Sequence, residues 1–134
     1  MKYRVFGDKI VVRLDPGDEV VNCLEEVRNR EKINGFFFGI GTVNHLKIGF
    51  YDFHKREYVE KNFDEDLEVT SLSGNIGKDR IHSHITVTDG NYQAYGGHLI
   101  EARVSGTMEI LIFDIGLELT TKINEDTGGR ILDI

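Results

Sequence analysis

The chain has 134 residues, a length that suits one domain with a core of its own, and we treat residues 1–134 as a single domain. Its composition is 40% hydrophobic and 29% charged, and no apolar run is long enough to cross a membrane. The formal net charge of −7, without any basic run, disfavours a duplex-DNA partner, because DNA-binding domains set clustered cations against phosphates. The single cysteine, Cys23, excludes an internal disulfide and, with no apolar signal region at the N-terminus, predicts a cytoplasmic protein.

The first third of the chain predicts two short strands and one helix. The strands cover residues 3–6 and 9–14 and are joined by a tight turn. Asp18 is the predicted N-cap of the helix, with Glu19 in its first turn, and Asn34 followed by glycine is predicted to end it. Apolar residues recur at helical spacing and predict the buried face: Val20, Val21, Cys23, Leu24 and Val27. We therefore interpret Cys23 as a packing residue rather than a nucleophile.

The rest of the chain alternates in the manner of β-structure. A nearly continuous apolar run over residues 36–43 predicts a central strand, and residues 46–51 and 57–61 predict a hairpin. Further strands are predicted over residues 67–73, 81–87, 92–95, 99–104, 107–115, 117–123 and 130–134. Many short strands with one helix predict an α+β fold with antiparallel pairing. One helix cannot cover both faces of such a sheet, so apolar strand surface is expected to be buried between subunits.

Three histidines form the strongest functional pattern in the sequence. His82 and His84 are two residues apart on a predicted strand, so their side chains point to the same face. His98 follows a pair of glycines that lets the backbone turn, and it could complete a site with three nitrogen ligands. Three protein ligands leave a position open for a ligand or substrate, and imidazole favours zinc. The other two histidines, His45 and His54, have no partner at useful spacing and are interpreted as surface residues.

Several short motifs, taken in order, resemble one known family. They are Gly-Ile-Gly-Thr-Val at 39–43, Gly-Phe-Tyr-Asp at 49–52, Leu-Ser-Gly-Asn at 72–75, His-Ser-His at 82–84, Asp-Gly at 89–90 and Gly-Gly-His-Leu at 96–99. Together they resemble the plants and prokaryotes conserved (PPC) domain, most closely its free-standing prokaryotic members. The resemblance covers nearly the whole chain and implies a curved, mainly antiparallel β-sheet packed on one α-helix. It also implies assembly as a homotrimer.

The same family carries a DNA-binding label that this sequence supports poorly. The plant domains are fused to AT-hooks, whose Arg-Gly-Arg core enters the minor groove, and no such tripeptide occurs here. The plant domains also begin one motif with Gly-Arg-Phe-Glu, whereas residues 65–68 of this chain are Glu-Asp-Leu-Glu. The plant domains lack the three histidines that this chain has. We therefore regard DNA as a doubtful partner.

A cupin is the rival interpretation of the histidine motif. Cupins combine a glycine, His-x-His, an acidic ligand and a later glycine, and the residues at 77, 82, 84, 89 and 96 come close to that spacing. However, Asp89 precedes Gly90 at a predicted turn, and the late proline of the second cupin motif is missing because the only proline is Pro16. The order of helix before sheet also fits a cupin badly.

Two charged residues are further site candidates. Glu101 could orient a histidine or act as a general base on a metal-bound water, and Arg13 could reach an anionic ligand across a subunit boundary. Three functions remain open from the sequence. They are a zinc-binding module for a small anionic ligand at a trimer interface, a metal-dependent enzyme of unknown substrate, and a DNA-associated protein.

Overall fold

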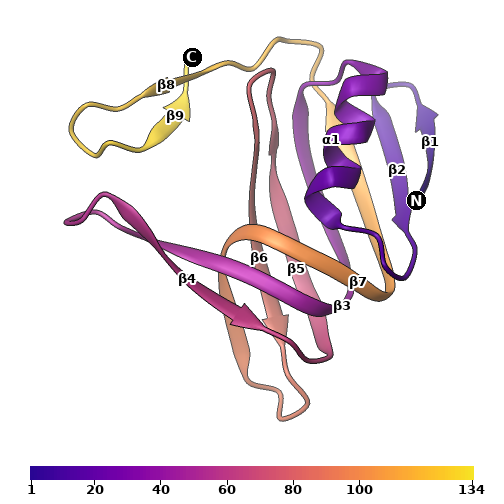
Figure 1. Ribbon diagram of the computed structural model, residues 1–134. Helices are drawn as coiled ribbons and strands as arrows, with labels where there is room; N and C mark the ends of the chain where they lie inside the picture. The colour runs from indigo at the N-terminus through magenta and orange to yellow at the C-terminus, as the bar shows by residue number, and fades with distance from the viewer.

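Seven strands form one antiparallel sheet in the order β1-β2-β7-β6-β5-β3-β4, and two more form a separate hairpin (Figure 1). The computed structural model describes residues 1–134. The elements are β1 (Lys2–Phe6), β2 (Lys9–Leu14), α1 (Val20–Glu31), β3 (Gly35–Asp52), β4 (Glu57–Phe63), β5 (Leu67–Ile76), β6 (Ile81–Thr88), β7 (Ala94–Asp114), β8 (Thr121–Ile123) and β9 (Arg130–Leu132). This arrangement confirms the predicted α+β fold, with mainly antiparallel strands and one helix.

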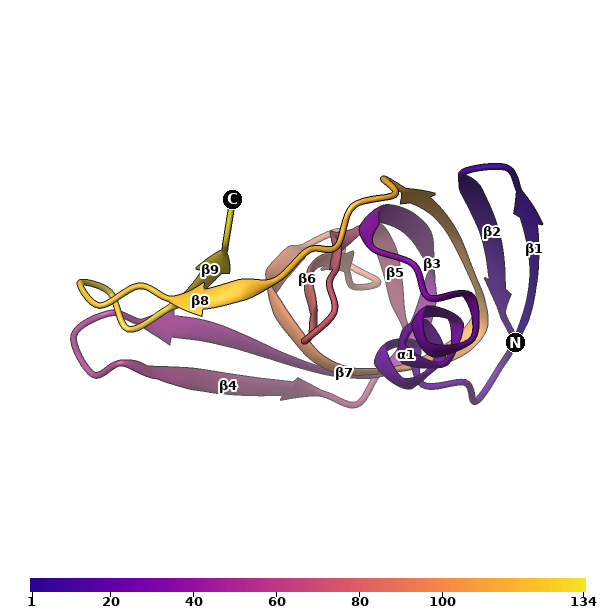
Figure 2. The same ribbon diagram turned by 90° about the horizontal axis from the view of Figure 1, so that it is seen from above.

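The sheet curves back on itself because its two longest strands pair with each other. β3 and β7 pair along most of their lengths, so the strands β3, β5, β6 and β7 close into a ring that is visible from above (Figure 2). Three register shifts in the β3–β7 pairing bend the two strands. At Gly41 the backbones approach so closely that a Cβ atom would collide with the carbonyl oxygen of Thr107.

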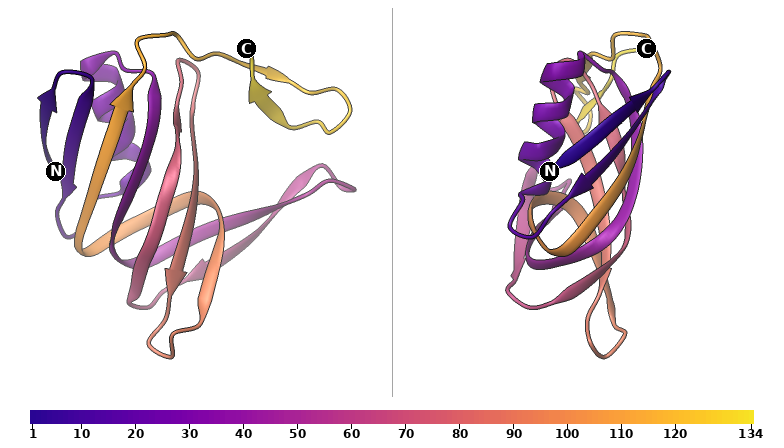
Figure 3. Two further views of the ribbon diagram at one scale, coloured as in Figure 1. Left: turned by 180° about the vertical axis from the view of Figure 1, so that it is seen from behind. Right: turned by 90° about the vertical axis from the view of Figure 1, so that its right-hand side faces the viewer.

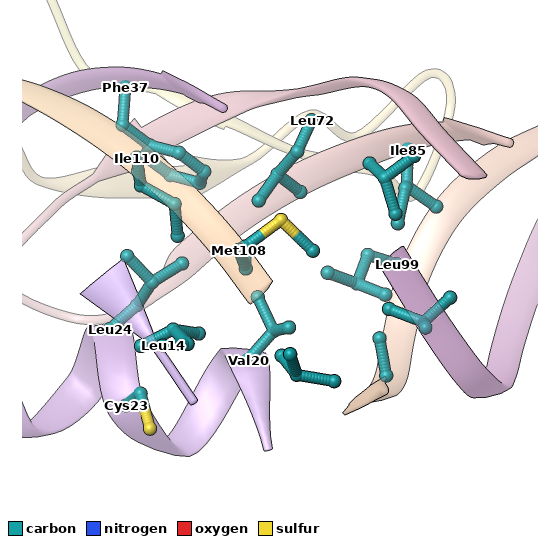
Figure 4. Packing of buried hydrophobic residues seen from close by; sticks show 14 of the residues in the cluster. Leu14, Val20, Cys23, Leu24, Phe37, Leu72, Ile85, Leu99, Met108 and Ile110 are labelled. Carbon is teal, nitrogen blue, oxygen red and sulfur yellow. The ribbon is translucent and has the colours of Figure 1, made fainter. Parts of the chain in front are cut away.

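The helix covers one side of the curved sheet (Figure 3) and closes the core. Four of the five residues that the helical spacing predicts are buried, namely Val20, Cys23, Leu24 and Val27, whereas Val21 is only partly buried at the edge of the core. They pack on apolar side chains of the sheet, with Met108 near the centre of the cluster (Figure 4). Burial raises the pKa of the Cys23 thiol to about 11, so the thiolate is scarce at neutral pH, in agreement with a packing role.

The face of the sheet that points away from the helix carries an apolar region. Alternation along β3 buries Phe37 in the core and leaves the side chains on either side of it partly in solvent: Phe36 is 46%, Phe38 54% and Ile40 58% exposed. Cross-strand neighbours on the same face extend this surface. We call it the phenylalanine patch, made of Val11, Phe36, Phe38, Ile40, Leu111 and Phe113.

The structure corrects the predicted ends of the helix. Glu19, not Asp18, is the N-cap, and its carboxylate accepts hydrogen bonds from the backbone N–H groups of the first turn at 3.1 and 2.7 Å. Asp18 instead pairs with the N-terminal ammonium of Met1 at 2.7 Å. The helix ends at Glu31, where Lys32 adopts a left-handed conformation without a glycine. Local sequence preferences could not foresee the contact with the chain terminus.

The structure also merges several predicted strands. The predicted segments 36–43 and 46–51 form one strand, β3, because the long strand bends instead of breaking. The predicted segments 99–104 and 107–115 likewise join in β7, which ends one residue earlier, at Asp114. The strand predicted over 117–123 is confined to β8, Thr121–Ile123. The predicted strand over 92–95 begins only at Ala94 and continues directly into β7.

The C-terminal hairpin, β8–β9, lies beside the projecting β3–β4 hairpin (Figures 1 and 2). The hydroxyl of Tyr51 donates a hydrogen bond to the carbonyl oxygen of Thr127 at 3.3 Å, and Arg56 donates to the carbonyl oxygen of Asp126 at 3.4 Å. Within the hairpin, Arg130 of β9 donates a hydrogen bond to the hydroxyl of Thr121 at 3.1 Å. No helix of the structure is long and apolar enough to span a membrane.

Candidate metal centre

The three histidines meet where β6 pairs with β7. His84 is directly opposite His98 in the antiparallel register, and His82 is two residues from His84 along β6. Ser83 between them is buried, so the two histidines point outward on the face that also carries the phenylalanine patch. The structure thus brings together the three histidines that were predicted as metal ligands.

One potential ligand nitrogen from each ring lies within 4.8 Å of the others. The ring centroids are 5.2 Å apart for His82 and His84, 5.2 Å for His82 and His98, and 5.8 Å for His84 and His98. A tetrahedral zinc with bonds of about 2.05 Å needs nitrogens about 3.3 Å apart, so side-chain rotation would have to draw the rings together. The backbone positions already suit such a site.

The surroundings favour the neutral form of two of the three imidazoles, those of His82 and His98. Burial lowers the pKa of His82 to about 4, with further contributions from Arg80, His98 and His84. Burial also lowers the pKa of His98 to about 4, with contributions from His84 and Arg80. A neutral imidazole has a free lone pair, which is the form that binds a metal ion.

His98 is held in place by aromatic stacking while one of its nitrogens lacks a partner. Its ring stacks on Tyr58 at 4.8 Å, and Tyr58 lies over Gly49, where a Cβ atom would approach the tyrosine ring within 2.7 Å. The Nδ1 atom of His98 is buried and makes no hydrogen bond. A buried nitrogen without a partner costs free energy unless a ligand completes it, so the residues present fit a metal ion.

Arg80, which the sequence analysis did not place at the site, belongs to this region. It directly precedes β6, two residues before His82, and it acts on the pKa of both His82 and His98. Tyr58 in turn acts on the pKa of Arg80. The only sequence signal for Arg80 is its spacing of two residues from His82. Strand alternation would place the two side chains on the same side of the sheet.

The two other candidates lie elsewhere in the chain. Arg13 is on β2 and pairs with Asp15 at 3.0 Å, with β7, β3 and β5 between it and β6 along the ring. A register shift in β7 places Glu101 opposite Lys47, and the carboxylate of Glu101 lies 3.8 Å from the ring of His45 and 4.0 Å from the guanidinium of Arg103. Neither residue joins the three histidines within one chain, and a contact of Arg13 across a subunit boundary stays a prediction.

His45 has a side-chain partner that its sequence spacing does not indicate. His45 lies within β3, and its Nδ1 atom is 2.5 Å from a carboxylate oxygen of Asp64. The sequence separation of nineteen residues hides this pair, because β3 and β4 fold back on each other before Asp64. His54 lies in the exposed β3–β4 turn, where its backbone N–H donates to Asp52.

A shallow groove of about 380 Å³ connects the histidines with the phenylalanine patch. Ser73 and Asn75 of β5 form its floor between Phe36 and the two β6 histidines. A ligand at the histidines would therefore have space to extend across β5.

The fold and the histidine site define a known class of protein. The Plants and Prokaryotes Conserved (PCC) domain model matches residues 1–116, and the chain belongs to this family, as the sequence motifs predict. A cupin is thereby set aside. The C-terminal hairpin lies outside the matched range.

Solved structures similar to this chain cover nearly its whole length. A candidate DNA-binding protein from Bacteroides thetaiotaomicron is 31% identical, with a TM-score of 0.93 over 98% of this chain and 96% of that one. A metal-containing protein from Archaeoglobus fulgidus is 32% identical, with a TM-score of 0.84 over 99% of this chain and 97% of that one. A curated relative from Synechococcus sp. (strain JA-2-3B'a(2-13)), named bifunctional protein GlmU, is 28% identical over 77% of this chain, which spans only 16% of that protein.

Proposed function

We propose that the chain is a metal-binding protein whose ion, zinc in the first instance, is held by His82, His84 and His98. The observation that carries the proposal is that His82, His84 and His98 each bring a potential ligand nitrogen within 4.8 Å of the others, while the Nδ1 atom of His98 is buried without a partner. The description of the Archaeoglobus fulgidus relative as metal-containing supports it. A zinc ion with three protein ligands would leave a coordination position open for a small molecule.

The ligand set favours a binding role over a hydrolytic one. An enzyme that activates a metal-bound water commonly places a carboxylate or histidine nearby as general base. Here no carboxylate acts on the pKa of His82 or His98, and Glu101 faces His45 instead. Binding of a small anionic ligand is therefore the main proposal, and a metal-dependent enzyme is the alternative.

Assembly as a homotrimer is the second part of the proposal. The phenylalanine patch supports it, because contiguous apolar surface of this kind is usually covered in a stable protein. The patch shares its face with the histidines, so a subunit that covers it would lie next to the metal site. The trimeric number itself rests on the family resemblance.

Elemental analysis of the protein purified without chelator tests the metal. About one divalent ion per chain is expected. His98→Ala should weaken zinc binding on the order of 100-fold, because one of three ligands is lost. His45→Ala is the matched control, since it removes a histidine that pairs with Asp64 and should leave the metal content unchanged. A chain without metal, and without thermal stabilisation by added zinc, would refute the proposal.

A further inference from the structure

The guanidinium of Arg80 is the most conspicuous unsatisfied cation of the molecule. Arg80 is half-buried at the start of β6, and its carbonyl oxygen accepts a hydrogen bond from the N–H of Gly77 at 2.9 Å, which fixes the turn before the strand. Its Nε atom is buried and has no hydrogen-bond partner. An arginine that is partly desolvated without a partner destabilises the fold unless a ligand compensates it.

Arg80 forms no ion pair with a carboxylate. Besides burial, the neighbours that act on its pKa are Tyr58 and Arg130, of which the second has the same charge. His82 follows Arg80 by two residues, and the ring of His82 lies 5.2 Å from that of His98. The adjacent acidic residue, Asp79, accepts a hydrogen bond from the backbone N–H of Thr121 at 3.4 Å instead of pairing with Arg80. Arg80 is thus an unpaired cation in a chain whose net charge is −7.

A metal ion would make the imbalance larger. Three neutral imidazoles add no negative charge to a divalent ion, so the ion and Arg80 together would carry about three positive charges. A closed zinc site usually contains cysteine or carboxylate ligands that offset the charge, and this site has neither. The charge therefore requires an anion, and the planar guanidinium is suited to bind one through two parallel hydrogen bonds.

We propose that Arg80 binds the anionic group, carboxylate or phosphate, of a small molecule that also occupies the open position of the metal, with Arg130 as a second, outer contact. The inference rests on the proposed metal site and adds an anion-binding residue from the same chain, whereas Arg13 was expected to act across a subunit boundary. Tyr58 connects Arg80 with the histidine site, because its ring stacks on His98 and it also acts on the pKa of Arg80. Arg130 lies on the C-terminal hairpin, which is anchored on the β3–β4 hairpin through Thr127, and its guanidinium donates a hydrogen bond to the hydroxyl of Thr121 at 3.1 Å.

Calorimetric titration of the zinc-loaded protein tests the inference with three probes. Glycolate supplies a carboxylate, inorganic phosphate supplies a phosphate, and imidazole is a neutral ligand for the open metal position. Arg80→Gln should raise the Kd of the preferred anion about tenfold or more, as expected for the loss of a charge-assisted hydrogen bond. The Kd of imidazole should stay unchanged, and the anion with the larger dependence on Arg80 identifies the natural group.

Further variants separate the possible outcomes. Arg103→Gln is the matched control, because Arg103 is exposed and its nearest carboxylate is that of Glu101. Arg130→Gln should raise the Kd of the preferred anion about threefold. If Arg80→Gln does not fold, Arg130→Gln and Arg80→Lys test the inference in its place. Two results would overturn the inference and leave the proposed metal site standing. One is equal anion affinity of wild type and variants at full zinc content, and the other is no anion binding to wild type at millimolar concentration. A wild-type chain that binds no zinc would overturn the proposed function and the inference with it.

Discussion

The histidine site and the phenylalanine patch occupy the same face of the same sheet, yet they are incomplete in opposite ways. Across the strands, Phe36 neighbours Asn75, which neighbours His82, and Phe38 neighbours Ser73, which neighbours His84. At one end polar nitrogens are buried without partners, and at the other end aromatic rings are exposed without cover. The first condition calls for an ion and an anion, the second for an apolar surface. Strand β5 thus separates two surfaces that need different partners: an ion with an anion at the histidines, and an apolar surface at the phenylalanine patch.

The largest expected effect tests the apolar end. Phe38→Glu places a charge in the phenylalanine patch, and we expect the trimer to dissociate, because a buried carboxylate without a partner is costly. Light scattering at low micromolar concentration should change from about three chain masses to one. Phe53→Glu, at the exposed tip of the β3–β4 hairpin, should leave the mass unchanged. A monomeric wild-type protein would contradict the proposal that another subunit covers the phenylalanine patch.

The next effect distinguishes the two ends through pH. His82 and His98 have folded pKa values of about 4, below the ordinary value of 6.5, so protonation favours the unfolded chain. Their contribution to the stability of the metal-free protein is therefore complete above pH 6.5 and is lost as the pH falls toward 4. The free energy of unfolding of metal-free protein, measured by denaturant titration, should fall over this range.

The matched variant for the pH experiment is the double substitution His82→Gln, His98→Gln. Its pH dependence should be flatter between pH 6.5 and 4, because the two groups that take up protons on unfolding are gone. Wild-type and variant profiles that run parallel would contradict the assignment of the acid sensitivity to the histidine site.

A smaller effect is expected from the support of His98. Gly49→Ala adds a Cβ atom that would come within 2.7 Å of the Tyr58 ring, so the tyrosine must move and the stacking on His98 is disturbed. Zinc affinity should fall about tenfold, in the range seen when residues that orient a metal ligand are changed. Gly90→Ala is the control, because a Cβ atom there meets open space. Unchanged zinc affinity in Gly49→Ala would show that Tyr58 does not position His98.

The sequence predicts the part of the site that is local and misses the part that depends on distant contacts. His82 and His84 follow from strand alternation, and His98 from the glycines before it. The pairing of His45 with Asp64 and the position of Arg80 beside Tyr58 depend on how β4 folds back along β3, which no short pattern encodes. The prediction that Glu101 lies beside the histidines fails for a similar reason, because a register shift in β7 changes the neighbours of Glu101. The fold class was predictable because one amphipathic helix and many alternating strands allow few architectures.

The smallest expected effect concerns DNA. The structure gathers Lys2, Arg4, Arg13 and Arg30 around one groove beside β1, which is the best candidate surface for phosphates. Two of these cations already have partners: Arg13 pairs with Asp15, and Arg30 pairs with Glu26 at 2.6 Å. Since the net charge of −7 also repels a phosphate backbone, we expect no tight binding of a DNA duplex at physiological salt, and no effect of Arg4→Gln in a gel-shift titration. Submicromolar, salt-sensitive binding that Arg4→Gln weakens would instead make this groove a functional surface, separate from both the histidine site and the phenylalanine patch.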